Sequence, residues 1–194
     1  ENMPYNAMVS ELLLSKGSNF RSPAVNFFRA FPRKTPDNIY NNIQLLFLGK
    51  RKTTDDGKVF FSQLSYKSTK EWKEEIIYLN YQLQAPDKSI RIEKNDFSLT
   101  TGSDWRKEYV DWLTSPKNER FAAVMVNRLW HWLMGKGLVF EPDDWRTDNL
   151  PSKPDLLEYL TKKFISGGYD MKAIIREIML SDAFQCKKTE VGTF

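Results

Sequence analysis

The strongest folding signals lie between residues 104 and 185, where helix start signals, apolar residues at helical spacing and glycine stops follow one another. Each predicted start places Ser or Asp before a run whose apolar residues recur every three or four positions. The predicted starts are Ser103 or Asp104, Ser115 followed by Pro116, Ser152 and Asp170. The glycines that fit helix ends are Gly135, Gly137, Gly167 and Gly168. This pattern predicts a C-terminal module of about four helices.

The preceding sequence predicts short helices and then a small sheet. Helical spacing marks Met3–Lys16, Pro23–Phe31 and Asn38–Leu48. β-branched and aromatic residues then gather in Val59–Phe61, Glu75–Tyr81 and Ser89–Glu93, which favours an antiparallel hairpin or a three-stranded patch. We therefore predict a mainly α fold of the α+β class. Its predicted parts are an N-terminal helical segment at 1–52, a small β-rich insertion at 53–99 and a C-terminal helical module at 100–194.

Charge and hydropathy restrict the partners that the chain can have. Its 29 Lys and Arg residues exceed its 25 Asp and Glu residues by only +4, which permits nucleic-acid binding without indicating it. The densest basic runs, Arg33-Lys34 and Lys50-Arg51-Lys52, are short, so we interpret them as solvated surface. No apolar stretch approaches the roughly 18 residues that a membrane-spanning helix needs, and we predict no span in this sequence.

Metal, haem and nucleotide sites find little support in the residue types present. Cys186 is the only cysteine, which excludes an intramolecular disulfide, a multi-cysteine zinc site and a C-x-x-C haem attachment within this sequence. His131 is the only histidine, so no metal site with two histidines can form. No glycine-rich phosphate loop opens a helix. We predict no metal and no cofactor.

Two tryptophans on the helix after Pro116 pose a packing question. Trp130 and Trp132 are two positions apart and project from nearly opposite sides of a helix. Either the helix is sandwiched between two layers, which we favour because indoles are mostly buried, or one indole is free for a partner such as a sugar ring. We interpret His131, between them, as a packed or interfacial side chain.

Arg128 lies at the edge of the apolar stripe of the same helix and needs an acidic partner. The following loop, Glu141-Pro142-Asp143-Asp144, supplies candidates. We favour a structural latch between loop and helix, and a buried latch should cost about 3–5 kcal/mol when one partner is deleted. The alternative is an anion or glycan site at which the paired carboxylates could act as acid and base. The candidate binding residues are Asn127, Arg128, Trp130, His131, Trp132, Glu141, Asp143, Asp144, Arg146 and Asn149.

Four sequence blocks give the chain a family resemblance. They read NRLW, GKGLV, EPDDWR and LSDAFQ, and they lie within residues 127–185. With their surroundings, residues 104–185 resemble the start of the domain-of-unknown-function family 1553. Residues 1–49 resemble the end of its companion family, 1549. The two families occur together in large exported proteins of planctomycetes and related bacteria, often in chains that also carry a cytochrome-c-like domain.

The resemblance implies export to the periplasm or cell surface, a larger parent chain and contact with other modules, but no activity. One departure is informative. Many members carry C-x-x-C-H-x-H-P-F after FLG, a stretch suited to haem or metal, whereas residues 50–61 here read KRKTTDDGKVFF. The resemblance therefore implies no redox or metal role for this segment.

From these observations we predict an uncharacterised module that acts as a non-catalytic scaffold or protein-interaction unit, with an enzymatic role disfavoured. The expected partners are other modules of the parent chain or neighbouring exported proteins. One alternative is the binding or hydrolysis of a glycan at Arg128 and Glu141–Asp144. A second alternative is nucleic-acid binding, which needs the two basic runs to form one continuous face.

Overall fold

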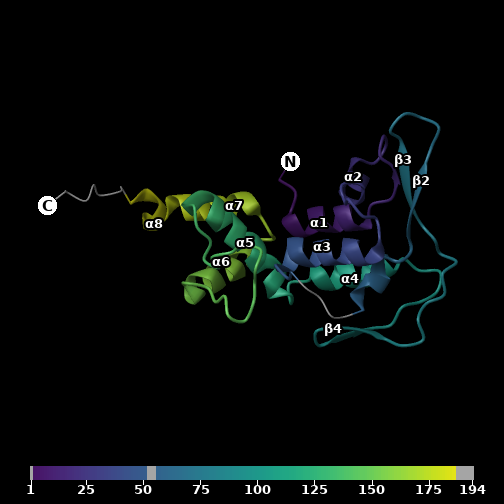
Figure 1. The fold of residues 1–194 in the computed structure, drawn as a ribbon. Coiled ribbons are helices and arrows are strands. Elements are labelled where there is room, and N and C mark those ends of the chain that lie inside the picture. The colour runs from purple at the N-terminus through teal and green to yellow at the C-terminus, as the bar shows by residue number, and fades with distance from the viewer. Residues whose placement is uncertain (1, 52–55, 187–194) are drawn as a thin grey trace.

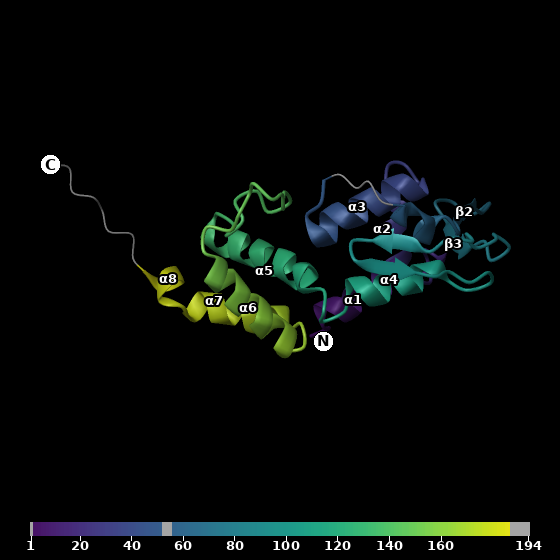
Figure 2. The same ribbon diagram turned by 90° about the horizontal axis from the view of Figure 1, so that it is seen from below.

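The computed structural model describes residues 2–51 and 56–186 and confirms a mainly α fold with a small antiparallel β component. Figures 1 and 2 show two groups of helices side by side along the long axis of the molecule. One group contains α1 (Tyr5–Leu14), α3 (Pro36–Leu48) and α4 (Trp105–Leu113). The other contains α5 (Glu119–Met134), α6 (Pro154–Ser166), α7 (Met171–Leu180) and α8 (Asp182–Gln185). Between α1 and α3, the short helices η1 (Pro23–Val25) and α2 (Asn26–Arg29) replace the single predicted helix.

The sheet that contains β2 (Leu64–Ser68) and β3 (Glu75–Leu79) lies at the far end of the first helix group, whereas β4 (Ile90–Ile92) lies along the side of this group, below α4 in the view of Figure 1. Strands β2 and β3 form an antiparallel hairpin, and the short β1 (Gly17–Ser18) pairs with the other edge of β3. A separate hairpin joins β4 to β5 (Asn95–Phe97). The expected strand at Val59–Phe61 is wrong, since these residues belong to the 3-10 helix η2 (Gly57–Phe61). Phe60 and Phe61 are both fully buried there, so their apolar character serves the core and not a strand.

Two predicted helix starts need correction. The helix expected from Pro116 begins at Glu119, because residues 115–118 form a turn that Asn118 closes by donating from its backbone N–H to the carbonyl of Ser115. Ser152 does not cap α6, whose first residue is Pro154; its hydroxyl donates instead to the carbonyl of Leu138. The caps at Asp104 and Asp170 are confirmed, since both carboxylates accept hydrogen bonds from backbone N–H groups of the helices they open.

The two helix groups share one hydrophobic core. The ring of Tyr5 in α1 stacks on Phe121 of α5 with ring centroids 5.0 Å apart, and its backbone N–H donates to the carbonyl of Tyr169. The buried cluster contains residues from each of the three predicted segments. Within the ranges 2–51 and 56–186, no helix combines the length and apolar character that crossing a membrane requires.

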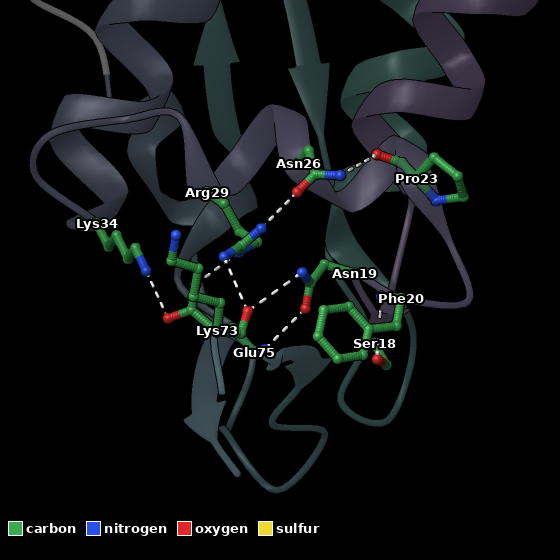
Figure 3. A network of polar contacts seen from close by, with 9 residues as sticks. All are labelled: Ser18, Asn19, Phe20, Pro23, Asn26, Arg29, Lys34, Lys73 and Glu75. Atoms are coloured by element: carbon green, nitrogen blue, oxygen red, sulfur yellow. Dashed lines mark hydrogen bonds and ion pairs between the residues drawn. The ribbon is translucent and has the colours of Figure 1, made fainter. Parts of the chain in front are cut away.

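A polar network fastens the N-terminal segment to the hairpin (Figure 3). Glu75, at the start of β3, accepts from Arg29 at 3.2 Å and from Lys34 at 2.5 Å. The Glu75 backbone N–H donates to the Asn19 side chain at 2.8 Å, and Asn19 donates in turn to the carbonyl of Lys73. Lys34, part of the first basic run, is therefore neutralised within the fold.

A second tie is buried. The guanidinium of Arg106 in α4 is fully covered and donates to the carbonyls of Leu14 and Ser15, at the C-terminal end of α1. It also donates twice to the Asp104 carboxylate, at 2.7 and 2.9 Å. The last carbonyls of a helix have no hydrogen-bond donor within that helix and carry partial negative charge. A cationic donor such as Arg106 therefore satisfies their hydrogen bonding and stabilises the helix end.

Candidate functional site

The helix α5 carries the first five candidate residues, and its buried Asn127 shapes the chain that follows. The Asn127 side chain donates to the carbonyl of Val139 at 3.1 Å and accepts from the Val139 backbone N–H at 2.9 Å. Gly137 lies against the same amide, where a Cβ would approach the Asn127 side chain to 3.2 Å. The Asn127 side chain therefore pairs with Val139 as a backbone peptide group would. This pairing fixes the turn after α5 and so the position of the loop that carries the acidic residues.

Arg128 and Asp143 form the predicted ion pair. The Arg128 guanidinium donates to Asp143 Oδ1 from Nε at 3.0 Å and from a terminal nitrogen at 2.5 Å. It also donates to the carbonyls of Leu46 and Leu45, the latter at 3.3 Å, near the C-terminal end of α3. The Arg128 side chain is only 16% exposed, but Asp143 is 55% exposed. The predicted pairing of helix and loop thus exists. Arg128 is held mainly by the carbonyls at the end of α3, whereas the Asp143 carboxylate is about half exposed to solvent.

We expect Arg128→Ala to lower the free energy of unfolding by about 1–3 kcal/mol, because charge-assisted hydrogen bonds to the α3 carbonyls are lost. In a chain of this size each kcal/mol corresponds to about 2–4 °C in melting temperature. Asp143→Asn is the matched control and should cost under about 1 kcal/mol, because an exposed ion pair contributes little. Thermal unfolding followed by circular dichroism measures both. Equal losses in the two variants would contradict the assignment of the main anchor to α3.

Arg120, which the sequence analysis did not single out, makes a similar tie about two turns earlier on α5. It donates to the carbonyl of Leu48 at 2.7 Å and to that of Trp145 at 2.6 Å, and its guanidinium lies 5.6 Å from the Trp145 ring centroid. Burial lowers the pKa of Arg120, with Glu93 opposing the change. Since an arginine stays charged at neutral pH even so, the end of α3 faces two permanent cations.

Asp144 is the most enclosed acidic residue of the loop. Its side chain is 10% exposed, and Oδ2 accepts from Arg146 Nε at 2.9 Å. Oδ1 lies 3.7 Å from Arg51 Nε and accepts no hydrogen bond within the described residues. Asn149 donates to the backbone carbonyl of Asp144 at 2.6 Å. The Asp144 carboxylate therefore lies between two arginines. Arg146 belongs to the same loop, and Arg51 belongs to the segment that follows α3.

The three aromatic candidates of α5 do not lie in a sandwich. Trp132 is 67% exposed, so the favoured expectation that both indoles are covered is wrong. Trp130 is half-buried and lines a hollow between α5, α6 and α7. The His131 Nδ1 atom is buried and accepts or donates no hydrogen bond in the described part of the chain. The buried residues of α5 all precede Trp130, and the helix packs against α3, α6 and α7.

The ten candidates therefore do not converge on one cleft. Asn127 serves the turn after α5, Arg128 and Asp143 serve the end of α3, and Asp144 and Arg146 line a polar hollow with Arg51. Trp130 faces a different, apolar hollow. Glu141 is exposed, and its backbone carbonyl accepts from the Asp144 N–H. Within residues 2–51 and 56–186, no cluster of three or more His, Cys, Asp or Glu side chains could hold a metal ion.

The NRLW block lies in α5, and the GKGLV and EPDDWR blocks lie in the loop between α5 and α6. Side chains of these blocks make the hydrogen bonds of Asn127, Arg128 and Arg146 described above. Residues 105–192 match the PSD1 family model, a protein of unknown function (DUF1553). The PSD1 match begins at the first residue of α4 and confirms the resemblance of the C-terminal segment to family 1553. The resemblance of residues 1–49 to family 1549 stays a prediction. A search of curated proteins and a search of solved structures both give no match to this chain.

Proposed function

We propose that this chain is a non-catalytic interaction module of an exported bacterial protein, and that its α6–α8 face binds an acidic amphipathic helix of a partner protein. The observation that carries the proposal is an apolar hollow of about 250 Å³ between α5, α6, α7 and α8. Its apolar lining residues are Trp130, Leu156, Tyr159, Leu160, Ile178, Leu180 and Ala183. Hollows of this composition accept the apolar face of a helix.

Exposed apolar side chains continue beyond this hollow. Leu180 is 67% exposed, and Met179 and Phe184 are also exposed. A neighbouring hollow of about 400 Å³ is lined by Ile175, Met179 and Leu180. Adjacent exposed apolar residues of this kind mark protein interaction sites more often than singly scattered ones do.

The charge beside this apolar strip identifies the chemistry of the partner. Lys172 and Arg176 line the neighbouring hollow, and neither forms an ion pair within the described residues. On the far side Glu177, which lines the apolar hollow, is paired with Lys163 at 2.6 Å. A partner helix with acidic residues along the edges of its apolar stripe would complement Lys172 and Arg176.

The polar motif supports the non-catalytic reading. Asp143 is held by Arg128, and Asp144 by Arg146, so two of the three acidic residues in Glu141–Asp144 are engaged in ion pairs. Glycan hydrolysis would instead need two available carboxyl groups about 5–9.5 Å apart on either side of a substrate cleft.

The nucleic-acid alternative gains no support. Arg33-Lys34 and Lys50-Arg51 flank α3 at opposite ends, which separates them by roughly 20 Å for a helix of this length. Lys52, the last residue of the second run, lies outside the described residues. Lys34 is paired with Glu75 and Lys50 with Glu93. A continuous basic stripe along a phosphate backbone does not form from these residues.

The proposal is tested with two synthetic amphipathic peptides of about 18 residues, with leucines at helical spacing and either Glu or Lys at the remaining positions. Isothermal titration should give a micromolar Kd for the acidic peptide and at least about tenfold weaker binding for the basic one. Leu180→Asp should abolish binding of the acidic peptide, because it places a like charge at the centre of the face.

Leu150→Asp is the matched control, since Leu150 is 74% exposed and lies outside both hollows. It should bind the acidic peptide as the unchanged protein does. Equal affinity for both peptides, or equal loss in both variants, would refute the proposal. Self-association that Leu180→Asp abolishes would assign the face to a second copy of the chain and would also refute it.

A further inference from the structure

A further hollow lies away from the α6–α8 face, between the end of α3 and the loop after α5. It measures about 580 Å³ and is lined by Gly49, Lys50, Arg51, Asp144, Trp145 and Arg146. Three of these six residues are cationic and one is anionic. We propose that this hollow binds a small molecule that carries an oxyanion beside hydroxyl groups, such as a sugar acid.

The backbone around the hollow is firmly placed. Gly49 ends α3 in a left-handed conformation, and a Cβ there would lie 2.4 Å from the Trp145 ring. The Trp145 backbone N–H donates to the Gly49 carbonyl at 3.0 Å, and its indole N–H donates to the carbonyl of Pro142 at 2.8 Å. Two segments far apart in sequence are thus fixed against each other, and their side chains meet in a preformed arrangement.

The Asp144 carboxylate lies between the guanidinium groups of Arg51 and Arg146, each of which approaches a different oxygen. Its Oδ2 accepts from Arg146, and its Oδ1 lies 3.7 Å from Arg51 Nε. The Arg51 and Arg146 side chains are nevertheless 57% and 63% exposed, so most of their N–H groups remain open to a ligand. Arg146 also lies 3.4 Å from Asp148, and Lys50 is paired with Glu93, which leaves Arg51 the cation with the fewest contacts. Each of these guanidiniums can form two parallel hydrogen bonds to a carboxylate, sulfate or phosphate.

Asp144 also specifies the second half of the ligand. Its Oδ1 atom is buried and accepts no hydrogen bond within the described residues. A carboxylate oxygen in that state is costly, and a simple anion would add repulsion to it. When a ligand binds, Arg51 would turn toward its oxyanion, and a ligand hydroxyl would donate to Asp144 Oδ1. This hydrogen bond would remove the cost of the unsatisfied carboxylate oxygen. The ligand class therefore combines a hydroxyl donor with an oxyanion acceptor.

The experiment compares D-glucuronate with its two halves, D-glucose and acetate, at constant ionic strength. Binding is followed by NMR from the indole N–H resonance of Trp145, which lines the hollow. Glucuronate should bind at least about tenfold more tightly than either half, since it combines the charge-assisted hydrogen bonds of the oxyanion with the hydroxyl contact to Asp144. Glucuronate no tighter than acetate would reduce the effect to general charge attraction and would overturn the proposal.

Variants locate the binding. Arg51→Gln and Arg146→Gln should each weaken glucuronate binding about tenfold. Arg91→Gln removes an arginine that is 70% exposed and also lies beside a carboxylate, that of Asp96, but on the β4–β5 hairpin. It should leave the affinity unchanged. An equal loss in Arg91→Gln, or an unshifted Trp145 resonance, would place the sugar acid elsewhere and would contradict the site. These outcomes are independent of the peptide titration, which probes the α6–α8 face.

Discussion

Arg106→Ala is expected to lower the free energy of unfolding by about 3–5 kcal/mol, the range for removing one partner of a buried ion pair. The guanidinium is fully buried and bonded to Asp104 and to the carbonyls of Leu14 and Ser15. Without it, the end of α1 loses its cation, those carbonyls lose the donors that the side chain supplies, and the Asp104 carboxylate keeps only the backbone N–H of position 106. The melting temperature should fall by roughly 6–20 °C for a chain of this size.

Chemical denaturation followed by circular dichroism measures the loss for Arg106→Ala. Arg91→Ala is its control, because the Arg91 side chain is 70% exposed, and it should change stability by under about 0.5 kcal/mol. Asp104→Asn should fall between the two variants, since it keeps an oxygen that can cap α4 but removes the charge. A loss below about 1 kcal/mol for Arg106→Ala would show that the tie to α1 contributes little.

Asn127→Ala carries the second-largest expected effect, a loss of about 2–5 kcal/mol. The substitution leaves the backbone N–H and carbonyl of Val139 without partners in a buried place, and each costs about 1–3 kcal/mol. It also opens a space beside Gly137. Denaturant unfolding gives the total, and hydrogen exchange of the Val139 amide should quicken most.

Asn42→Ala is the matched control for Asn127→Ala. Asn42 is partly buried in α3, and its side chain donates only to the carbonyl of Asn38 one turn earlier, so its removal should cost under about 1 kcal/mol. Exchange that quickens evenly along the chain in Asn127→Ala would argue for a global loss of packing and against a specific role in the turn.

Much of the fold could be predicted from local signals. The caps at Asp104 and Asp170 and the apolar spacing of α4 to α7 identify four helices because capping and amphipathic patterning depend on neighbouring residues. The strand predicted at Val59–Phe61 was wrong because a short apolar run has the same sequence pattern in a strand and in a buried turn of helix. The helix start expected at Pro116 failed because the turn at Asn118 competes with it.

The candidate site was predicted in part. The pairing of Arg128 with Asp143 follows from a cation on an apolar stripe and an acidic loop directly after it. Its contacts with Leu45 and Leu46 lie more than 80 positions away in sequence and have no local signal. The same holds for Arg106 and Arg120, which meet the ends of α1 and α3, and for Arg51 beside Asp144. When an arginine binds backbone carbonyls, the sequence contains no acidic residue that would indicate its partner.

The arginine ties bear on where the chain can be divided. The helices α1 and α3 end on carbonyls that receive their donors from Arg106, Arg120 and Arg128, all of which lie within the PSD1 match. A truncated chain that begins at residue 105 would keep these cations and lose the helix ends that bind them. It would also expose the face of Phe121 on which Tyr5 stacks. The boundary of sequence similarity therefore falls inside one hydrophobic core, and we expect a fragment without the N-terminal helices to be less stable than the whole chain.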